Sequence, residues 1–244
     1  MHKELTLDRI RAVLARLEET IIFALIERSQ FSLNRVVYLP GALGVALGDR
    51  SLINFLLHGT EVLHSQLRRY TSSDEHPFFS DLPDPILERL DFPDVLVTDG
   101  TLNFNARIRE VYEQHVVTQI CAEGDDGQYG SSAVNDVVCL QALSKRIHYG
   151  EFVAESKFQA YTDRYAPLIA AGDREGLVSL LTDTEVEINV VQRVREKTAQ
   201  YAGLIQAAND STLTPEIVVK IYKDWVIPLN KEVQVEYLLR RPVL

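Results

Sequence analysis

Hydrophobic positions recur with the period of an α-helix along most of the chain. Between residues 6 and 30 the apolar stripe comprises Leu7, Ile10, Leu14, Leu17, Ile21 and Leu25. The spacing of three or four positions is that of one helical face. The same period predicts helices over 50–70, 104–121, 131–161, 165–171, 174–182, 184–208 and, in two stretches, from Thr214 onward. No stretch of useful length alternates as a strand does, so we predict an all-α protein.

Proline, glycine and short polar residues mark the predicted loops. The stretch TSSDEHPFFSDLPDP at 71–85 is one, a less regular region follows to about residue 103, and EGDDGQYGSS at 123–132 is another. Residues 131–161 contain no Pro and only Gly150, which predicts a helix of about 30 residues, long for a globular protein. No break resembles an interdomain linker. We therefore expect residues 1–244 to form a single-domain helical bundle with one long central helix.

Composition narrows the class of protein. The chain is 46% hydrophobic and 25% charged, as in ordinary globular proteins, and its net charge of −10 argues against nucleic acid as a partner. No apolar run approaches the roughly 20 residues that span a bilayer, and the first residues contain no apolar leader, so we expect a soluble, cytoplasmic protein with no membrane partner. Cys121 and Cys139 are then expected to be a reduced pair.

Familiar catalytic motifs are missing. The glycines of GALGVALG lack the dinucleotide-binding pattern, and neither a phosphate-binding loop nor a G-x-S-x-G motif occurs. The six histidines are scattered without metal-ligand spacing. We expect no metal and no cofactor.

The predicted central helix contains a candidate binding face. Arg146 and Lys157 are eleven positions apart, about three turns, so they share a face, with Gly150, Val153 and Ala154 between them. Two cations above small residues suit a compact ligand with more than one negative group. A solvated charged face is the alternative that spacing alone leaves open. Gly150 costs about 1 kcal/mol relative to alanine inside a helix, so it needs a packing or binding reason.

Two other helices place polar residues one turn apart. Asp183 and Glu187 are one such pair, although Asp183 is equally interpreted as an N-cap. Asn230 and Gln234 are the other, and they lie among core-forming residues, where a buried amide needs a hydrogen-bond partner. In the first helix Arg11 follows the apolar position Ile10, and alone it would be an exposed arginine.

Long stretches of this sequence resemble the all-helical chorismate mutases of fungi and plants. They are GDDGQYGSSAVNDVVCLQALSKRIHYGEFVAESKF, DWVIPLNKEVQVEYLLRR, LTLDRIRAVLARLEETIIFALIERSQF and SSDEHPFF. The resemblance covers essentially the whole chain and is weakest over 31–60 and 81–105. It implies a homodimeric isomerase that converts chorismate to prephenate, without a cofactor, in phenylalanine and tyrosine biosynthesis. It also implies an effector site for Trp, Tyr or Phe at the subunit interface.

Site residues follow from the positions that match the family motifs. Arg11 and Arg146 match arginines that bind the substrate carboxylates, Lys157 and Gln234 match the two donors to the ether oxygen, and Glu187 matches the acceptor for the ring hydroxyl. The resemblance makes these five residues catalytic. Asp183 and Asn230 fall at substrate-binding positions where members differ.

The effector site carries over less completely. Arg68 and Arg69 match arginines that bind the effector carboxylate, and Gly130 and Ser131 match a loop that contacts its amino-acid moiety. Fungal members have two asparagines where this chain has Gly127 and Gln128, so the existence and sign of regulation stay open, and exposed arginines at a helix end are the alternative. Two other functions stay open: an inactive helical relative that binds a partner protein, and an exported mutase acting on another organism's chorismate.

Overall fold

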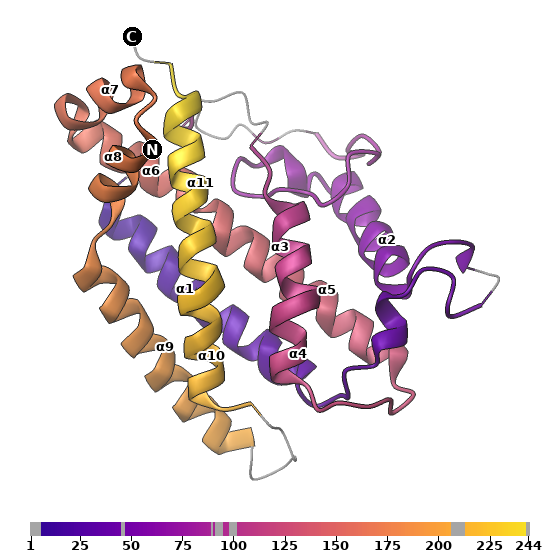
Figure 1. Ribbon diagram of the computed structural model, residues 1–244. Helices are drawn as coiled ribbons and strands as arrows, with labels where there is room; N and C mark the ends of the chain where they lie inside the picture. Colours follow the sequence, from indigo (N-terminus) through magenta and orange to yellow (C-terminus); the bar gives the residue numbers. More distant parts are fainter. Residues whose placement is uncertain are drawn as a thin grey trace.

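Every regular element in the described part of the chain is helical (Figure 1). The computed structural model describes residues 6–44, 47–88, 90, 95–97, 102–205 and 213–242. The α-helices are α1 (Leu7–Arg28), α2 (Leu52–Gln66), α3 (Asn105–Val111), α4 (Val117–Ile120), α5 (Tyr129–His148), α6 (Gly150–Ala160), α7 (Thr162–Ala171), α8 (Arg174–Leu181), α9 (Thr184–Ile205), α10 (Pro215–Ile221) and α11 (Ile227–Arg240). Short 3₁₀ turns, η1 (Arg35–Tyr38) and η3 (Arg69–Thr71), and π-helical turns, η4 (Tyr112–Val116) and η5 (Tyr222–Val226), complete the set.

Helix starts agree with the side chains that cap them. The Thr6 hydroxyl accepts from the backbone N–H of Arg9 at the start of α1, and Thr214 does the same for Ile217 at the start of α10, where Pro215 occupies the first turn. The predicted N-cap at Thr214 is therefore confirmed. The helix predicted over 184–208 is present as α9. Its last three predicted residues, 206–208, lie outside the described part of the chain.

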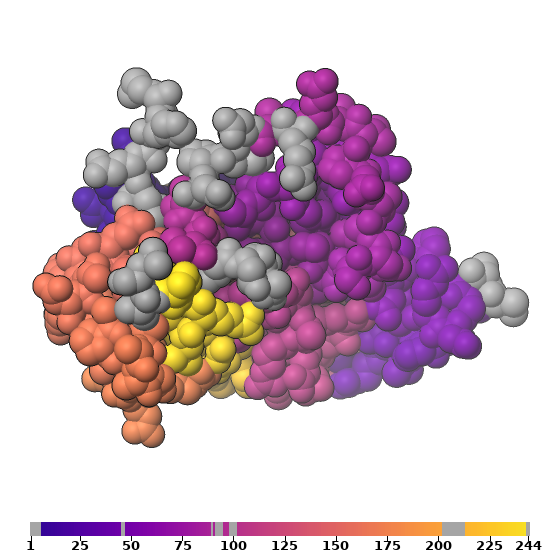
Figure 2. Space-filling view, turned by 90° about the horizontal axis from the view of Figure 1, so that it is seen from above, coloured from indigo at the N-terminus to yellow at the C-terminus, as the bar shows by residue number. Residues whose placement is uncertain are grey.

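The helices pack around a shared apolar core. α1 packs on α5 and α9, α11 on α6, α8 and α5, and α2 on the outer side of α5. Figure 2 shows the orange α7–α8 region beside yellow α11 at one end of the molecule and the violet α2 region at the other. In the described part of the chain, no helix combines the length and the apolar character needed to cross a membrane.

The predicted 30-residue helix is present as two helices, α5 and α6, that meet at Tyr149. The Asn230 side-chain amide donates to the carbonyls of Ile147, at 2.9 Å, and Arg146, at 3.4 Å. Those carbonyls would accept from residues 151 and 150 in an unbroken α-helix. A side chain inserted into the ladder in this way is a recognised cause of a helix break.

The C-terminal helical run also changes register. Between α10 and α11 the π-helical turn η5 inserts an extra residue, and Pro228 follows in the first turn of α11. Proline has no N–H to donate and its ring crowds the carbonyl four residues earlier, which explains a wider turn at this point. The turn sets the direction in which Asn230 and Gln234 face.

Candidate active site

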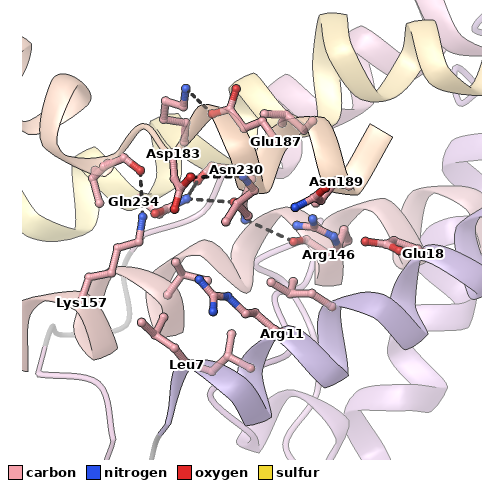
Figure 3. Close-up of a pocket in the computed structure, with 18 of the residues that line it drawn as sticks. Leu7, Arg11, Glu18, Arg146, Lys157, Asp183, Glu187, Asn189, Asn230 and Gln234 are labelled. Carbon is pink, nitrogen blue, oxygen red and sulfur yellow. Dashed lines mark hydrogen bonds and ion pairs between the residues drawn. The ribbon is translucent and has the colours of Figure 1, made fainter. Parts of the chain in front are cut away.

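One cavity of about 330 Å³ lies among α1, α5, α6, α9 and α11, and its volume suits a small ligand. Its walls comprise Leu7, Ile10, Arg11, Leu14, Glu18, Arg146, Val153, Lys157, Leu181, Asp183, Val186, Glu187, Asn189, Val190, Arg193, Ile227, Asn230, Lys231 and Gln234. All seven residues predicted to be catalytic or substrate-binding are in this set. Figure 3 shows Arg11, Arg146 and Lys157 facing Asp183, Asn230 and Gln234 across the cavity.

The cavity wall is positive although the chain is acidic. It contains five cations, Arg11, Arg146, Lys157, Arg193 and Lys231, and three carboxylates, Glu18, Asp183 and Glu187. Their formal sum is +2, against −10 for the whole chain. A wall of this sign favours a ligand with two negative charges.

Arg146 has unused hydrogen-bonding capacity. Its side chain is buried, and within the described part of the chain its Nε and Nη1 atoms have no hydrogen-bond partner. Burial lowers the pKa of this guanidinium, and Tyr222 and Glu18 oppose that effect. A buried guanidinium without partners is costly unless an anion satisfies it, so the side chain is suited to binding a ligand carboxylate.

Lys157 lies on α6, on the same cavity. Its ammonium donates to the backbone carbonyl of Leu181 at 2.8 Å, which leaves two N–H bonds for other acceptors. Burial lowers the pKa of Lys157, and Asp183 opposes that effect. The partly desolvated ammonium is therefore a strong hydrogen-bond donor to an oxygen that gains negative charge.

Asp183 and Glu187 begin α9. Asp183 Oδ1 accepts from the backbone N–H of Val186 at 3.1 Å, so the N-cap interpretation is confirmed, and Asp183 also lines the cavity. Glu187 sits in the first turn and forms an ion pair with Lys231 on α11 at 2.7 Å. Arg11 is more open than these groups: its side chain is 53% exposed and lies 3.7 Å from Asp8.

Asn230 and Gln234 form a relay of amides on α11. Because Asn230 Nδ2 donates to the Ile147 carbonyl, its Oδ1 faces Gln234 and accepts from Gln234 Nε2 at 3.0 Å. The second Nε2 contact, to the Asn230 backbone oxygen, is 3.4 Å long and therefore weak. Within the described residues Gln234 Oε1 has no partner. The buried amides thus satisfy each other in part and keep capacity for a ligand.

Comparisons with known proteins agree with this geometry. Residues 128–235 match the family model for chorismate mutase type II. Over 246 residues the chain is 44% identical to the chloroplastic chorismate mutase 1 of Petunia hybrida, covering 97% of this chain and 76% of that protein.

The chain belongs to the chorismate mutase family.

Solved chorismate mutases share its fold. The Candida albicans enzyme, solved in complex with L-Trp, superposes with a TM-score of 0.91 at 39% identity, covering 97% of this chain and 92% of that one. The enzyme AtCM1, solved with tyrosine in its allosteric site, superposes with a TM-score of 0.90 at 45% identity, covering 97% and 96%. This protein is therefore an all-helical isomerase. The comparisons support this interpretation over the alternative of an inactive helical relative that binds a partner protein.

The chorismate mutase cavity includes charged residues that sequence reasoning missed. Glu18 is fully buried and accepts two hydrogen bonds from Arg193, at 2.8 and 2.6 Å, while Lys231 completes the wall beside Glu187. Glu18 raises the pKa of Arg193 through these bonds. Glu18 lies seven residues after Arg11, two turns along the same face, and that spacing was the available signal. Arg193 had none.

Gly150 has a packing function in this mutase rather than a binding one. A Cβ on Gly150 would lie 2.7 Å from the Asn230 backbone oxygen and 3.2 Å from Val233 Cγ1. Val153 lines the cavity, whereas Gly150 and Ala154 are absent from its wall. The expectation that these small residues form an alcove under the ligand is therefore corrected: glycine lets α11 approach α6.

The predicted effector residues do not all meet in this chain. Arg69 is held by Glu75, His64 and Gln141, and Arg68 donates to the Glu88 carbonyl, so they are not simply exposed arginines at a helix end. Gly130 and Ser131 belong to the first turn of α5 rather than to a loop. Ser131 is ten residues from Gln141 on α5, about 15 Å at the rise of an α-helix.

Proposed function

We propose that this cavity binds chorismate and converts it to prephenate by an intramolecular Claisen rearrangement. In that reaction the C–O bond of the enolpyruvyl ether breaks as a C–C bond forms, and no group leaves the molecule. The chain's own residues then need to fold the substrate over its ring and stabilise the charge that develops. Neither a nucleophile nor a proton transfer is required.

Arg11 and Arg146 bind the two carboxylates in this proposal. Paired guanidinium–carboxylate hydrogen bonds fix orientation as well as charge, so they hold the ether chain in the compact reactive conformer. Arg146 is the buried end of the clamp, and Arg11 is the exposed end that closes on the second carboxylate. Holding the reactive conformer removes much of the entropic part of the barrier.

Lys157 and Gln234 donate to the ether oxygen, on which negative charge grows as the C–O bond breaks. Lys157 has N–H bonds to spare beside its contact with Leu181, and Gln234 releases its long 3.4 Å contact to donate. Donors placed in advance at a developing charge are worth about 3–4 kcal/mol each. Glu187 accepts from the ring hydroxyl, and Asp183 and Asn230 support the wall.

The observation that supports this proposal most strongly is the buried guanidinium of Arg146, whose Nε and Nη1 have no partner among the described residues, in a cavity wall of net charge +2. The test is a direct assay of purified protein: chorismate consumption and prephenate formation, with and without a chelator. We expect activity without added metal or nucleotide. Activity that a chelator abolishes and a metal restores would contradict the cofactor-free mechanism.

We also propose a homodimer with an effector site between subunits. The outer faces of α2 and α5, with Leu67 at the C-cap of α2, expose a run of apolar side chains: Phe55, Leu63, Leu67, Val134 and Val138. Such a run favours a partner surface. A site that used Arg69 of one subunit and Ser131 of the other would also remove the separation of about 15 Å along α5. Aromatic amino acids are the proposed effectors because related enzymes were solved with Trp or Tyr bound.

Light scattering of the intact protein tests the dimer, and Leu63→Glu should shift it to monomer. Rate measurements with Trp, Tyr and Phe test the effectors.

We further propose that the 244 residues form one domain around the shared core and that the enzyme serves phenylalanine and tyrosine biosynthesis in the cytoplasm. Fluorescence imaging of the tagged protein tests whether it lies in the cytoplasm or in the chloroplast; the Petunia hybrida relative is named as a chloroplastic enzyme.

A further inference from the structure

Lys231 is a charged residue of the cavity wall that the proposed mechanism leaves without a role. Its ion pair with Glu187, at 2.7 Å, joins the start of α11 to the first turn of α9. The side chains are 23% and 34% exposed, so the pair is partly shielded from water. Both residues also line a smaller neighbouring cavity of about 300 Å³. The pair therefore lies where the two cavities meet.

Substrate binding creates a need for this pair. Chorismate brings two negative charges to a wall that already contains three carboxylates. Nearby negative charges disfavour the ionised form of a carboxyl group, whereas a cation in contact favours it. Glu187 accepts a hydrogen bond from the ring hydroxyl most strongly as a carboxylate. A cation beside Glu187 thus maintains the acceptor when the cavity is filled.

We propose that Lys231 is a positioning residue of this chorismate mutase, whose ion pair holds the Glu187 carboxylate directed at the ring hydroxyl of bound chorismate. The inference rests on the proposed function, and in particular on Glu187 as the hydroxyl acceptor. The backbone next to Lys231 is held by packing, because the preceding residue, Asn230, lies against Gly150 of α6 and donates to the Ile147 carbonyl.

Other charged groups line the two cavities that Glu187 also lines. They are Arg11 and Glu18 on α1, Arg146 on α5, Lys157 on α6, Arg174 on α8, Asp183 and Arg193 of the α9 region, Lys223 on η5 and Glu232 on α11. In the described part of the chain, Lys231 alone is within ion-pair distance of Glu187. Lys231 is also one of the cations that lower the pKa of Lys157, after burial itself.

A purely structural ion pair is the competing explanation. A partly exposed pair contributes little to stability, and its loss would change the melting temperature without changing the shape of a pH profile. The test therefore measures kcat/KM for chorismate from pH 5 to pH 8 in wild type, Lys231→Met, Lys231→Gln and Lys231→Arg. Circular dichroism melts identify which variants are folded.

We expect both neutral variants to lose activity chiefly at acid pH. Without the cation, protonation of Glu187 competes at higher pH, so the loss at pH 5 should exceed the loss at pH 8 by about threefold or more. Lys231→Arg should restore the wild-type profile because it keeps the charge. In a Glu187→Gln background, Lys231→Met should add no further pH dependence, because the titrating group is gone.

Lys223 provides a matched control for electrostatic steering. It has the same charge, lines the neighbouring cavity and, within the described residues, forms no ion pair with Glu187. Lys223→Met should leave the shape of the pH profile unchanged. Parallel profiles for wild type and both neutral Lys231 variants would overturn the inference, as would equal, salt-dependent losses in Lys223→Met and Lys231→Met. An inactive wild type would instead overturn the proposed function.

Discussion

Replacing Gly150 by alanine should damage both the stability and the activity of this enzyme, although alanine is the better helix former. The added Cβ would lie 2.7 Å from the Asn230 backbone oxygen and 3.0 Å from its Nδ2 atom. Backbone atoms cannot rotate away. To restore ordinary contact at 3.4 Å, α11 would have to retreat from α6 by about 0.7 Å.

The magnitude follows from two opposing terms. Alanine gains about 1 kcal/mol of helix propensity over glycine. Overpacking costs about 1–3 kcal/mol, and the hydrogen bond from Asn230 to the Ile147 carbonyl, worth about 1 kcal/mol, is strained as the helices separate. We expect a net destabilisation of about 1–2 kcal/mol. Since Gln234 and Lys231 move with α11, a shift of this size should lower kcat more than tenfold.

Gly59 supplies a matched control. It lies in the exposed face of α2, and a Cβ built there meets no heavy atom within 4 Å. Because Gly59 lies between Phe55 and Leu63 on the proposed dimer face, light scattering must first show that the variant keeps the oligomeric state of the wild type. In that state Gly59→Ala should raise the free energy of unfolding by up to about 1 kcal/mol and leave kcat unchanged. Urea unfolding at fixed pH and initial rates of chorismate consumption measure both quantities in both variants.

The reasoning is wrong if Gly150→Ala proves as stable as Gly59→Ala and keeps the wild-type kcat. That result would mean that α6 and α11 do not approach as closely as described. A loss of stability without a loss of kcat would separate the two claims: the packing argument would survive, and the link from α11 to catalysis would not.

Three further predictions concern single side chains. Gln234→Glu should be most active in acid, because the new carboxyl can donate to the ether oxygen only while it is protonated. Above the pKa of that carboxyl, kcat should fall about tenfold per pH unit. A kcat profile parallel to that of the wild type from pH 5 to 8 would refute contact between Gln234 and the breaking bond. Arg146→Ala should lower kcat/KM by about 10²–10³. Arg69→Ala should leave the basal rate nearly intact and remove any response to Trp or Tyr. Equal losses of kcat/KM in the two variants would show that the active site has been misplaced. Burial, with His76 as a smaller cause, lowers the pKa of His148 from 6.5 to about 3. Between these two values the unfolded chain binds a proton that the folded chain excludes. The free energy of unfolding should therefore fall by about 1.4 kcal/mol per pH unit as the pH drops below 6.5. Urea titrations at pH 7 and 5 should show a smaller fall in His148→Gln, and an equal fall would assign it to other groups.

Local information in the sequence was sufficient for the helices. Periodic apolar positions predicted the all-α class, and the Thr214–Pro215 start was readable because capping depends on residues three positions apart. Five of the charged residues of the cavity were also predicted: Arg146 and Lys157, and Asp183 and Glu187, from helical spacing, and Arg11 from the resemblance to a family.

What the sequence could not show depended on contacts between distant segments. The break at Tyr149 exists because an amide from α11, more than 80 residues later, binds carbonyls at the end of α5. The small size of Gly150 is explained by that neighbouring helix and not by a ligand. Arg193 and Lys231 enter the site through partners on other helices, Glu18 and Glu187. Helical periodicity is a property of one segment, whereas the distance between two helices is set by the side chains of both, and only the folded chain brings those together.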